Sequence, residues 1–499
     1  MRPPRRPRRL TAFLLAPLLT GCFAATGDAA TTPDAKVGAR LRVALAFPPT
    51  QDLSPYGADA TILSRLGVTE GLTALDANGS AAPALASSWR RENDRTWLFT
   101  LREALFQDGT DVTPAAVVTA LTRAGRAAPA PAALTGVTLT ARAQGATGVR
   151  ITTAAPDPAL PLRLAGPGLA VLAPKAYADA DTVDPVGTAT GPFALTEITG
   201  TTSATLDRFD DHWAGRAQAS GIDARFIADG TARANALRTG QVDIAEAIPV
   251  SQAAALDADS RRETATTRTT SLHLNTKSGL FKDPALRAAA RAAVDTEALA
   301  EGVYEGHADP GAGLFGPAVT WAEAKRVTPS GRARPGRPDG ASITLATYDN
   351  RPELPEAAQV LKQQLEKAGF AVKLEVREYA RLESDALAGT FDAVIGARNS
   401  LLDTGDPVSL LDSDFTCDGG YNLALLCDSD VDRAVERART VADTDKRQDA
   451  ALAAEAVILA TDAVVPLVHQ RVVTGVADTV GGVLLDPYER TLVGTGTRR

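Results

Sequence analysis

The most informative part of the sequence runs from Val68 to Thr110, VTEGLTALDANGSAAPALASSWRRENDRTWLFTLREALFQDGT. Three of its segments favour tight turns, at residues 76–79, 92–94 and 107–110. Asn-Gly and Asp-Gly pairs adopt positive φ at little cost and therefore connect strands tightly. Between the last two turns, the segment RTWLFTLR at residues 95–102 places large apolar side chains at alternate positions. This period of two predicts a β-strand.

The order of these residues resembles the signature of the family 5 extracytoplasmic solute-binding proteins, the peptide and nickel receptors of ABC importers. The matching positions are Glu70-Gly71-Leu72, Asp76, Gly79, Pro83 to Ala86, Ser88-Trp89, Trp97 to Phe99, Leu101-Arg102, Phe106 and Asp108 to Thr110. Two later segments, GPFAL at 191–195 and SLHLNT at 271–276, resemble the same family. The resemblance covers about residues 40 to 487. The stretch at residues 68–110 is expected to hold a surface subdomain together and to identify the family, without contacting a ligand.

The resemblance implies an α/β, two-lobed fold of the periplasmic-binding-protein type (type II, cluster C), with an extra subdomain in the first lobe. A hinge between the lobes would allow them to close over a ligand. We expect this division of the chain: a signal peptide at 1–21, a tether at 22–39, lobe one at 40–271 with an inserted subdomain at about 58–184, lobe two at 272–467, and a return to lobe one at 468–499.

Residues 343–397 contain the clearest α/β pattern. Strands are expected at 343–348, 372–376 and 391–397, and helices at 355–368 and 379–388. This alternation predicts a parallel sheet with right-handed crossovers. Ligands of such sheets bind in the crevice beyond the carboxyl ends of the strands. These ends carry Asp349-Asn350 and Arg398-Asn399, which makes the segments after them candidates for a binding site.

The N-terminus has the pattern of an export signal. Residues 1–21 contain five Arg followed by an apolar run, Leu10 to Leu19, which is too short to span a bilayer. The sequence Leu19-Thr20-Gly21-Cys22 resembles the lipobox of bacterial lipoproteins. This resemblance implies that Cys22 carries lipid and anchors the protein to the outer face of the cell membrane. The alternative is an ordinary signal peptide with a chance cysteine.

The remaining cysteines favour a disulfide. With Cys22 assigned to lipid, only Cys417 and Cys427 remain. An even pair in an exported protein predicts a bridge, which would stabilise the chain by about 2–3 kcal/mol in the chain-entropy account. A metal site is the alternative, although two cysteines ten residues apart without a nearby histidine make a poor ligand set.

Charge and motif content disfavour several classes of function. Removing the five Arg of residues 1–21 from the 52 basic residues leaves 47 against 60 acidic ones. Such an acidic chain is a poor binder of nucleic acid. The motifs GxSxG and HExxH are absent, and the four histidines are far apart, which disfavours a hydrolase or a zinc enzyme. The segment 311–316 is formally GxGxxG, but the prolines on both sides predict a loop. We expect no catalytic residue, metal or cofactor.

The resemblance implies a monomeric receptor that captures di- or oligopeptides and delivers them to the permease subunits of an ABC importer. Gly405-Asp406-Pro407 resembles the GDP segment of the dipeptide-binding members. It therefore carries to Asp406 the role of binding the peptide ammonium in a charge-assisted hydrogen bond. Its carboxylate is expected to face an open cleft in the absence of ligand. Alternatively, Asp406 only caps the helix that follows.

Other binding candidates match the family less clearly. Arg351 and Arg398 are both near enough in sequence to bind a peptide carboxylate. Asn275, Asn350 and Asn399 are weaker candidates for the crevice. The alternatives to a peptide receptor are a receptor for a nickel chelate or another small solute, and a secreted hydrolase.

Overall fold

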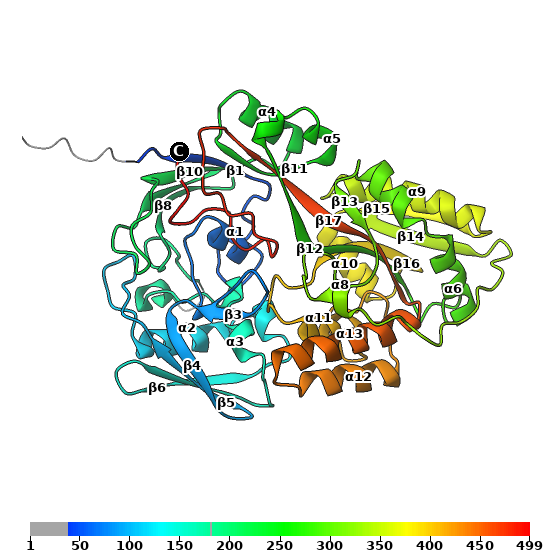
Figure 1. The fold of residues 1–499 in the computed structure, drawn as a ribbon, viewed down its shortest axis with the longest axis horizontal. Helices are drawn as coiled ribbons and strands as arrows, with labels where there is room; N and C mark the ends of the chain where they lie inside the picture. Colours follow the sequence, from blue (N-terminus) through cyan, green and yellow to red (C-terminus); the bar gives the residue numbers. More distant parts are fainter. Residues whose placement is uncertain (1–37, 180–181) are drawn as a thin grey trace, which may run out of the picture. The chain divides into compact units, whose positions relative to one another are not determined.

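The computed structural model describes residues 38–179 and 182–499, which form a mixed α/β fold (Figure 1). Its largest sheet has eleven strands, in the order β15-β14-β16-β12-β17-β11-β1-β10-β9-β8, with β13 paired to β17. These strands are β1 (Leu41–Leu45), β8 (Phe193–Thr199), β9 (Ser203–Arg208), β10 (Gly221–Phe226), β11 (Ile244–Ile248), β12 (Arg261–Leu274), β13 (Ala308–Pro310), β14 (Ser342–Tyr348), β15 (Ala371–Arg377), β16 (Ala393–Asn399) and β17 (Val464–Val476). The expectations for residues 1–37, including lipid on Cys22, lie outside the described residues.

The two long strands β12 and β17 connect the halves of this sheet. They pair with each other in antiparallel fashion, from Arg261 opposite Gly475 to His273 opposite Val464. On one side β17 pairs with β11 of the first lobe, and on the other side β12 pairs with β16 of the second lobe. Both strands are therefore shared by the two lobes (Figure 1).

The α/β pattern at residues 343–397 is confirmed. Strand β14 pairs in parallel with both β15 and β16, as the alternation of strands and helices predicts. The helices between them are α9 (Glu353–Lys367) and α10 (Tyr379–Leu387). The sheet as a whole is mixed, because β12 joins this unit in antiparallel fashion. Strand β16 ends at Asn399, and the segment 400–406 follows its carboxyl end.

A separate sheet in the first lobe contains the stretch that identifies the fold. Its order is β4-β5-β7-β6, and a two-stranded sheet of β2 and β3 precedes it. The strands are β2 (Thr73–Leu75), β3 (Ala81–Pro83), β4 (Ala86–Asn93), β5 (Thr96–Leu101), β6 (Leu139–Gln144) and β7 (Gly148–Thr153). Gly79 and Gly109 have φ of 75° and 81°, as the turns require. We call residues 73–163, from β2 to the end of α3, the four-stranded unit.

Several of the helices begin at residues whose side chains cap the first N–H groups. Helix α2 starts at Pro114, and the Thr113 side chain accepts a hydrogen bond from Ala116 N. Besides α9 and α10, the helices are α1 (Asp59–Arg65), α2 (Pro114–Ala124), α3 (Leu160–Arg163), α4 (Gly230–Arg238), α5 (Val250–Ala253), α6 (Pro284–Ala293), α7 (Thr296–Ala298), α8 (Ala322–Lys325), α11 (Pro407–Phe415), α12 (Ser429–Arg439) and α13 (Thr444–Ala460). Short helical turns lie at η1 (Ala132–Leu134), η2 (Pro167–Leu169), η3 (Pro174–Tyr177), η4 (Ala258–Ser260) and η5 (Leu299–Val303).

One expected helix is interrupted. The pattern of apolar residues predicts a single helix from Pro284 to Ala300, but α6 ends at Ala293. Val294 has an extended ψ of 123°, and the Asp295 side chain accepts a hydrogen bond from Ala298 N. Because this carboxylate satisfies an N–H group at a helix start, a new helix begins there.

Apolar packing divides the described chain into several cores. The first lobe and the four-stranded unit share one, which includes the fully buried Phe99 and Phe193. The second lobe has a core beneath its sheet, with Leu361, and another among α11, α12 and α13, with Leu411 and Leu452. No helix within residues 38–179 and 182–499 is long and apolar enough to span a bilayer.

Candidate functional site

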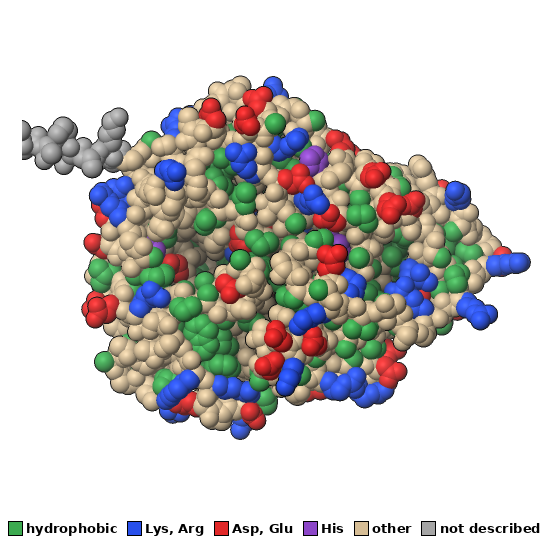
Figure 2. Space-filling view, viewed as in Figure 1, with side chains coloured by type: hydrophobic (Ala, Val, Ile, Leu, Met, Phe, Trp, Pro, Cys, Tyr) green, Lys and Arg blue, Asp and Glu red, His purple; other side chains and the backbone are tan. Residues whose placement is uncertain are grey.

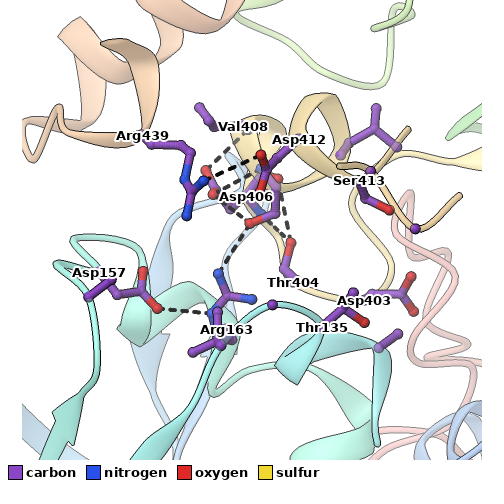
Figure 3. Close-up of a pocket in the computed structure, with 18 of the residues that line it drawn as sticks. Thr135, Asp157, Arg163, Asp403, Thr404, Asp406, Val408, Asp412, Ser413 and Arg439 are labelled. Atoms are coloured by element: carbon purple, nitrogen blue, oxygen red, sulfur yellow. Dashed lines mark hydrogen bonds and ion pairs between the residues drawn. The ribbon is translucent and has the colours of Figure 1, made fainter. Parts of the chain in front are cut away.

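A cavity of about 350 Å³ lies between the four-stranded unit and the second lobe. Figure 3 shows Asp157 and Arg163 of the four-stranded unit on one side, with Asp406, Asp412 and Arg439 of the second lobe opposite them. The second lobe contributes the loop after β16, helix α11 and the start of α13. From the second lobe, the cavity begins just beyond the carboxyl end of β16, whereas Asn350, just beyond the end of β14, lines a different cavity.

Asp406 lies in the wall of this cavity, but its carboxylate is not open to a ligand. The residue is 1% exposed, and its two oxygens accept hydrogen bonds of 2.8 and 2.7 Å from Nε and Nη2 of Arg447. The carboxylate also caps α11, accepting from the backbone N–H groups of Val408 and Ser409. Burial alone would raise the pKa of Asp406, but the charge and hydrogen bonds of Arg447 hold it below the ordinary value. The structure contradicts the expectation that this carboxylate faces an open cleft.

Asp403, three residues earlier, presents a more accessible carboxylate to the same cavity. Its side chain is 30% exposed, and Oδ2 lies 3.4 Å from Nη1 of Arg398. The strand-end rule makes the whole loop between β16 and α11 a candidate, including Asp403. Within that loop the GDP resemblance favours Asp406, so the sequence gives no reason to choose Asp403.

Arg398, an expected binding residue, does line the cavity. Its Nε donates to Oδ2 of Asp414 at 3.2 Å, and its guanidinium lies 4.8 Å from the centre of the Tyr421 ring. These contacts hold the guanidinium beside Asp403. Burial raises the pKa of Asp414, although the charge of Arg398 opposes this effect.

Arg439 is the most loosely held cation of the cavity wall. Its Nη1 lies 3.5 Å from both Asp412 Oδ1 and Glu436 Oε2, and its side chain is 44% exposed. Burial raises the pKa of Asp412, while the charge of Arg439 acts to lower it. The cavity thus offers exposed groups of both signs, which suits a zwitterionic ligand.

Asn399 lies at the lobe junction, where its side-chain amide forms hydrogen bonds within the protein. Nδ2 donates to Oε1 of Glu489 at 3.0 Å and to the Tyr488 carbonyl at 3.4 Å. Oδ1 accepts a hydrogen bond of 2.6 Å from the hydroxyl of Thr267. No free donor or acceptor is left on this side chain within the described structure, so Asn399 supports the loop after β16 rather than contacting the cavity.

Asn275 and Asn350 lie away from the main cavity. Asn275 donates to the Phe391 carbonyl at 2.9 Å and accepts from Lys277 N at 2.9 Å. Asn350 accepts a hydrogen bond from Tyr379 N at 3.0 Å and is exposed. The Asn275 side chain closes the turn after β12, and that of Asn350 accepts from the first residue of α10. Sequence position alone does not separate these roles from ligand binding.

Arg351 lines a separate, smaller cavity of about 110 Å³. Burial, and then the charge of Arg268, lower the pKa of its guanidinium. Its guanidinium carbon lies 5.9 Å from the Phe47 ring centre, and among the described residues no carboxylate lies within ion-pair distance. A half-buried cation without an anionic partner is costly, so Arg351 is a second candidate for binding an anionic group.

A disulfide joins Cys417 and Cys427 in the structure. The loop that it closes contributes residues 418–420 to the wall of the main cavity. Across residues 38–179 and 182–499, no three His, Cys, Asp or Glu side chains gather as metal ligands.

Comparison with known proteins places the chain among binding proteins. Residues 80–422 match the family described as bacterial extracellular solute-binding proteins, family 5 middle. The chain is similar to the nickel-binding protein NikA of Staphylococcus aureus, with 24% identity over 459 residues and 89% of each chain covered. It is also similar to the glutathione-binding protein GsiB of Escherichia coli O157:H7, with 26% identity over 465 residues, covering 87% of this chain and 90% of that one.

A solved structure supports the two-lobed fold. The periplasmic binding protein DppA from Helicobacter pylori, in complex with the peptide STSA, matches with a TM-score of 0.77. The identity is 19%, and the match covers 92% of this chain and 98% of that chain. At this identity the likeness concerns the fold.

Proposed function

Because the chain belongs to the family 5 bacterial extracellular solute-binding proteins of ABC importers, we propose that it captures peptides and delivers them to the permease of its importer. The observation that supports a peptide is the accessible Asp403 carboxylate in a cavity that also contains the exposed guanidinium of Arg439. A short peptide presents an ammonium and a carboxylate, which complement these two kinds of group. The relatives include a glutathione-binding protein and a structure with a bound peptide.

In this proposal Asp403 binds the ligand ammonium. A charge-assisted hydrogen bond of this kind contributes about 1.5–3 kcal/mol. Asp406 and Asn399 act as positioning residues, since their hydrogen bonds hold the two ends of the loop that carries Asp403. The lobes approach each other about β12 and β17, and the exclusion of water strengthens the contact.

Two guanidinium groups are available for the ligand carboxylate. Arg439 lies in the same cavity as Asp403 and has only two long ion-pair contacts. Arg351 has no carboxylate partner in the described structure but lines a different cavity, which shares no residue with the first. A ligand that reaches Arg439 stays within one cavity, so we assign the carboxylate contact to Arg439 for the shortest peptides.

Calorimetry with three protein variants tests the proposal. Asp403→Ala is expected to weaken binding of Ala-Ala-Ala by about ten- to a hundredfold, at about 1.4 kcal/mol per tenfold. Asp418→Ala, which removes an exposed carboxylate from the rim of the same cavity, is the matched control and should bind nearly as the native protein does. Arg439→Gln should weaken binding of the free peptide but not of its C-terminal amide.

N-acetylation of the peptide provides a second test. The native protein should bind acetyl-Ala-Ala-Ala as weakly as Asp403→Ala binds the free peptide. If the acetylated peptide binds normally, the ligand is not recognised through a free amine. If no peptide binds but a nickel chelate does, the peptide assignment is wrong and the chain is a receptor for another solute.

A further inference from the structure

A second cavity, of about 230 Å³, collects three of the four tryptophans of the chain. Trp89 on β4 and Trp97 on β5 line it from the four-stranded unit, and Trp321, directly before α8, lines it from the second lobe. Most of its remaining wall is apolar and includes Pro158, Pro161, Leu162, Leu401 and Pro407. Figure 2 shows hydrophobic side chains gathered at the surface over β4. We call this space the tryptophan cavity.

The rings of the tryptophan cavity are held in place from behind. Trp97 donates its indole N–H to the Asp157 carbonyl at 3.1 Å. The ring centre of Trp89 lies 6.1 Å from that of Phe99, and the ring centre of Trp321 lies 5.8 Å from that of Phe315. Because Phe99 and Phe315 are fully buried, these contacts fix the ring planes while all three tryptophans stay half-buried. Preorganised rings of this kind bind a further ring without loss of their own side-chain freedom.

The charges around the tryptophan cavity favour a neutral occupant. Asp406 is the only acid among its lining residues, and both of its oxygens are used by Arg447. A cage for an ammonium group combines aromatic faces with the absence of competing cations, whereas here the Arg447 guanidinium is part of the wall. A cationic side chain is therefore disfavoured.

The polar groups that remain are neutral. Ser80, Thr444 and Gln448 line the cavity, and the Trp321 indole N–H has no hydrogen-bond partner among the described residues. A small number of such groups in an apolar pocket orients a ligand by hydrogen bonds. A ring that carries a hydroxyl group would find both donors and acceptors here.

The tryptophan cavity borders the main cavity. Pro158, Asp406 and Arg447 line both spaces, so one wall separates the Asp403 carboxylate from the three indole rings. A ligand held in the main cavity by its ammonium is consequently close to an aromatic pocket formed by both the four-stranded unit and the second lobe.

We propose that the tryptophan cavity is a side-chain subsite that receives a neutral aromatic ring of the ligand, such as the side chain of Phe or Tyr. The identity of the ligand in this inference rests on the proposed function as a peptide receptor. Offset or edge-to-face contacts with the three indoles would select an aromatic ring over an aliphatic side chain of similar size. The ring would also contact both the four-stranded unit and the second lobe, and would so favour the approach of these two parts.

The test compares three tripeptides by calorimetry: Ala-Phe-Ala, Ala-Leu-Ala and Ala-Lys-Ala. The native protein should bind the Phe peptide about three- to tenfold more tightly than the Leu peptide, and the Lys peptide most weakly. Trp321→Leu keeps an apolar wall but removes one ring, and should abolish the preference for Phe over Leu. Trp213→Phe changes the one tryptophan outside the cavity, and should keep the preference.

Equal affinity for the Phe and Leu peptides in the native protein would overturn the inference while leaving peptide binding intact. A Phe preference that survives Trp321→Leu would overturn it as well. If no peptide binds, the proposed function fails, and N-acetylphenylalanine amide then tests the cavity alone by ligand-observed NMR. Binding to the native protein and to Trp213→Phe but not to Trp321→Leu supports the subsite, and binding to none of them overturns it.

Discussion

Glu489 is the most informative residue for testing how the lobes are held together. Its carboxylate accepts hydrogen bonds of 3.0 Å from both Nε and Nη2 of Arg268 on β12, and one of 3.0 Å from Asn399. A further ion pair, at 3.4 Å, comes from Arg65 on α1. The change Glu489→Gln keeps the shape of the side chain but leaves two buried guanidinium groups without this anion.

The pKa of Glu489 sets the expected magnitude. Burial alone would raise it, but the charge of Arg268 with its hydrogen bonds, and then that of Arg65, lower it from 4.5 to about 2. At 1.36 kcal/mol per pKa unit, this difference corresponds to about 3 kcal/mol of folding free energy at neutral pH. Removal of one partner from a buried pair typically costs a similar amount, about 3–5 kcal/mol.

The contribution has a defined dependence on pH. A carboxyl group whose pKa is lowered in the folded state stabilises the protein fully above its unfolded pKa, near 4.5. This stabilisation is lost as the pH falls toward 2. Urea unfolding of native protein and Glu489→Gln should therefore differ by about 3 kcal/mol from pH 7 to pH 5, and the difference should shrink between pH 4.5 and pH 2.

Glu366→Gln is the matched control, because Glu366 pairs with Lys362 on the exposed face of α9. Such exposed pairs contribute about 0.3–0.5 kcal/mol, so this variant should unfold nearly as the native protein does. A difference below 1 kcal/mol for Glu489→Gln, or one that does not change with pH, would refute the reasoning about the buried carboxylate.

Three further predictions concern single sites. Asp406→Ala should destabilise the unliganded protein by about 3–5 kcal/mol in a denaturation experiment, because it leaves Arg447 buried without its partner; an unchanged melting temperature would contradict this. Non-reducing mass spectrometry of the exported protein should find Cys417 joined to Cys427, whereas two free thiols or a stoichiometric metal would contradict the bridge. Cys22→Ser should release the protein into the medium, and a variant that stays at the membrane would show that Cys22 is not the anchor.

Local signals predicted most of the fold because they depend on neighbouring residues. Thr113 and Pro114 start a helix through contacts within one turn, and the positive φ of Gly79 follows from the chemistry of its turn. The parallel unit follows from an alternation of strands and helices. In contrast, the pairing of β12 with β17 joins residues about 200 positions apart, and no local pattern encodes it.

The site was harder to predict because a short loop serves two purposes. The residues before a helix cap it with the same carboxylates that bind an ammonium. Asp406 is assigned to the first role by Arg447, 41 residues later, and only tertiary packing brings that guanidinium to it. Asp403 stays accessible because Arg398 approaches it only to 3.4 Å. The distinction lies in partners that the sequence of the loop does not contain.

The segment after β17 explains how the loop that carries Asp403 responds to the position of the lobes. Arg490 donates hydrogen bonds of 2.8 Å to the carbonyls of both Leu401 and Leu402 in the second lobe, and one of 2.9 Å to the Ala165 carbonyl in the first. Burial lowers the pKa of this guanidinium to about 10, which reflects the cost of placing it away from water. Separation of the lobes would hydrate Arg490 and recover part of that cost, while it would release the loop next to Asp403. In the proposed function, the free energy of opening would therefore depend on the balance between lost hydrogen bonds and regained hydration, and the contacts of a bound ligand would shift it toward the closed arrangement.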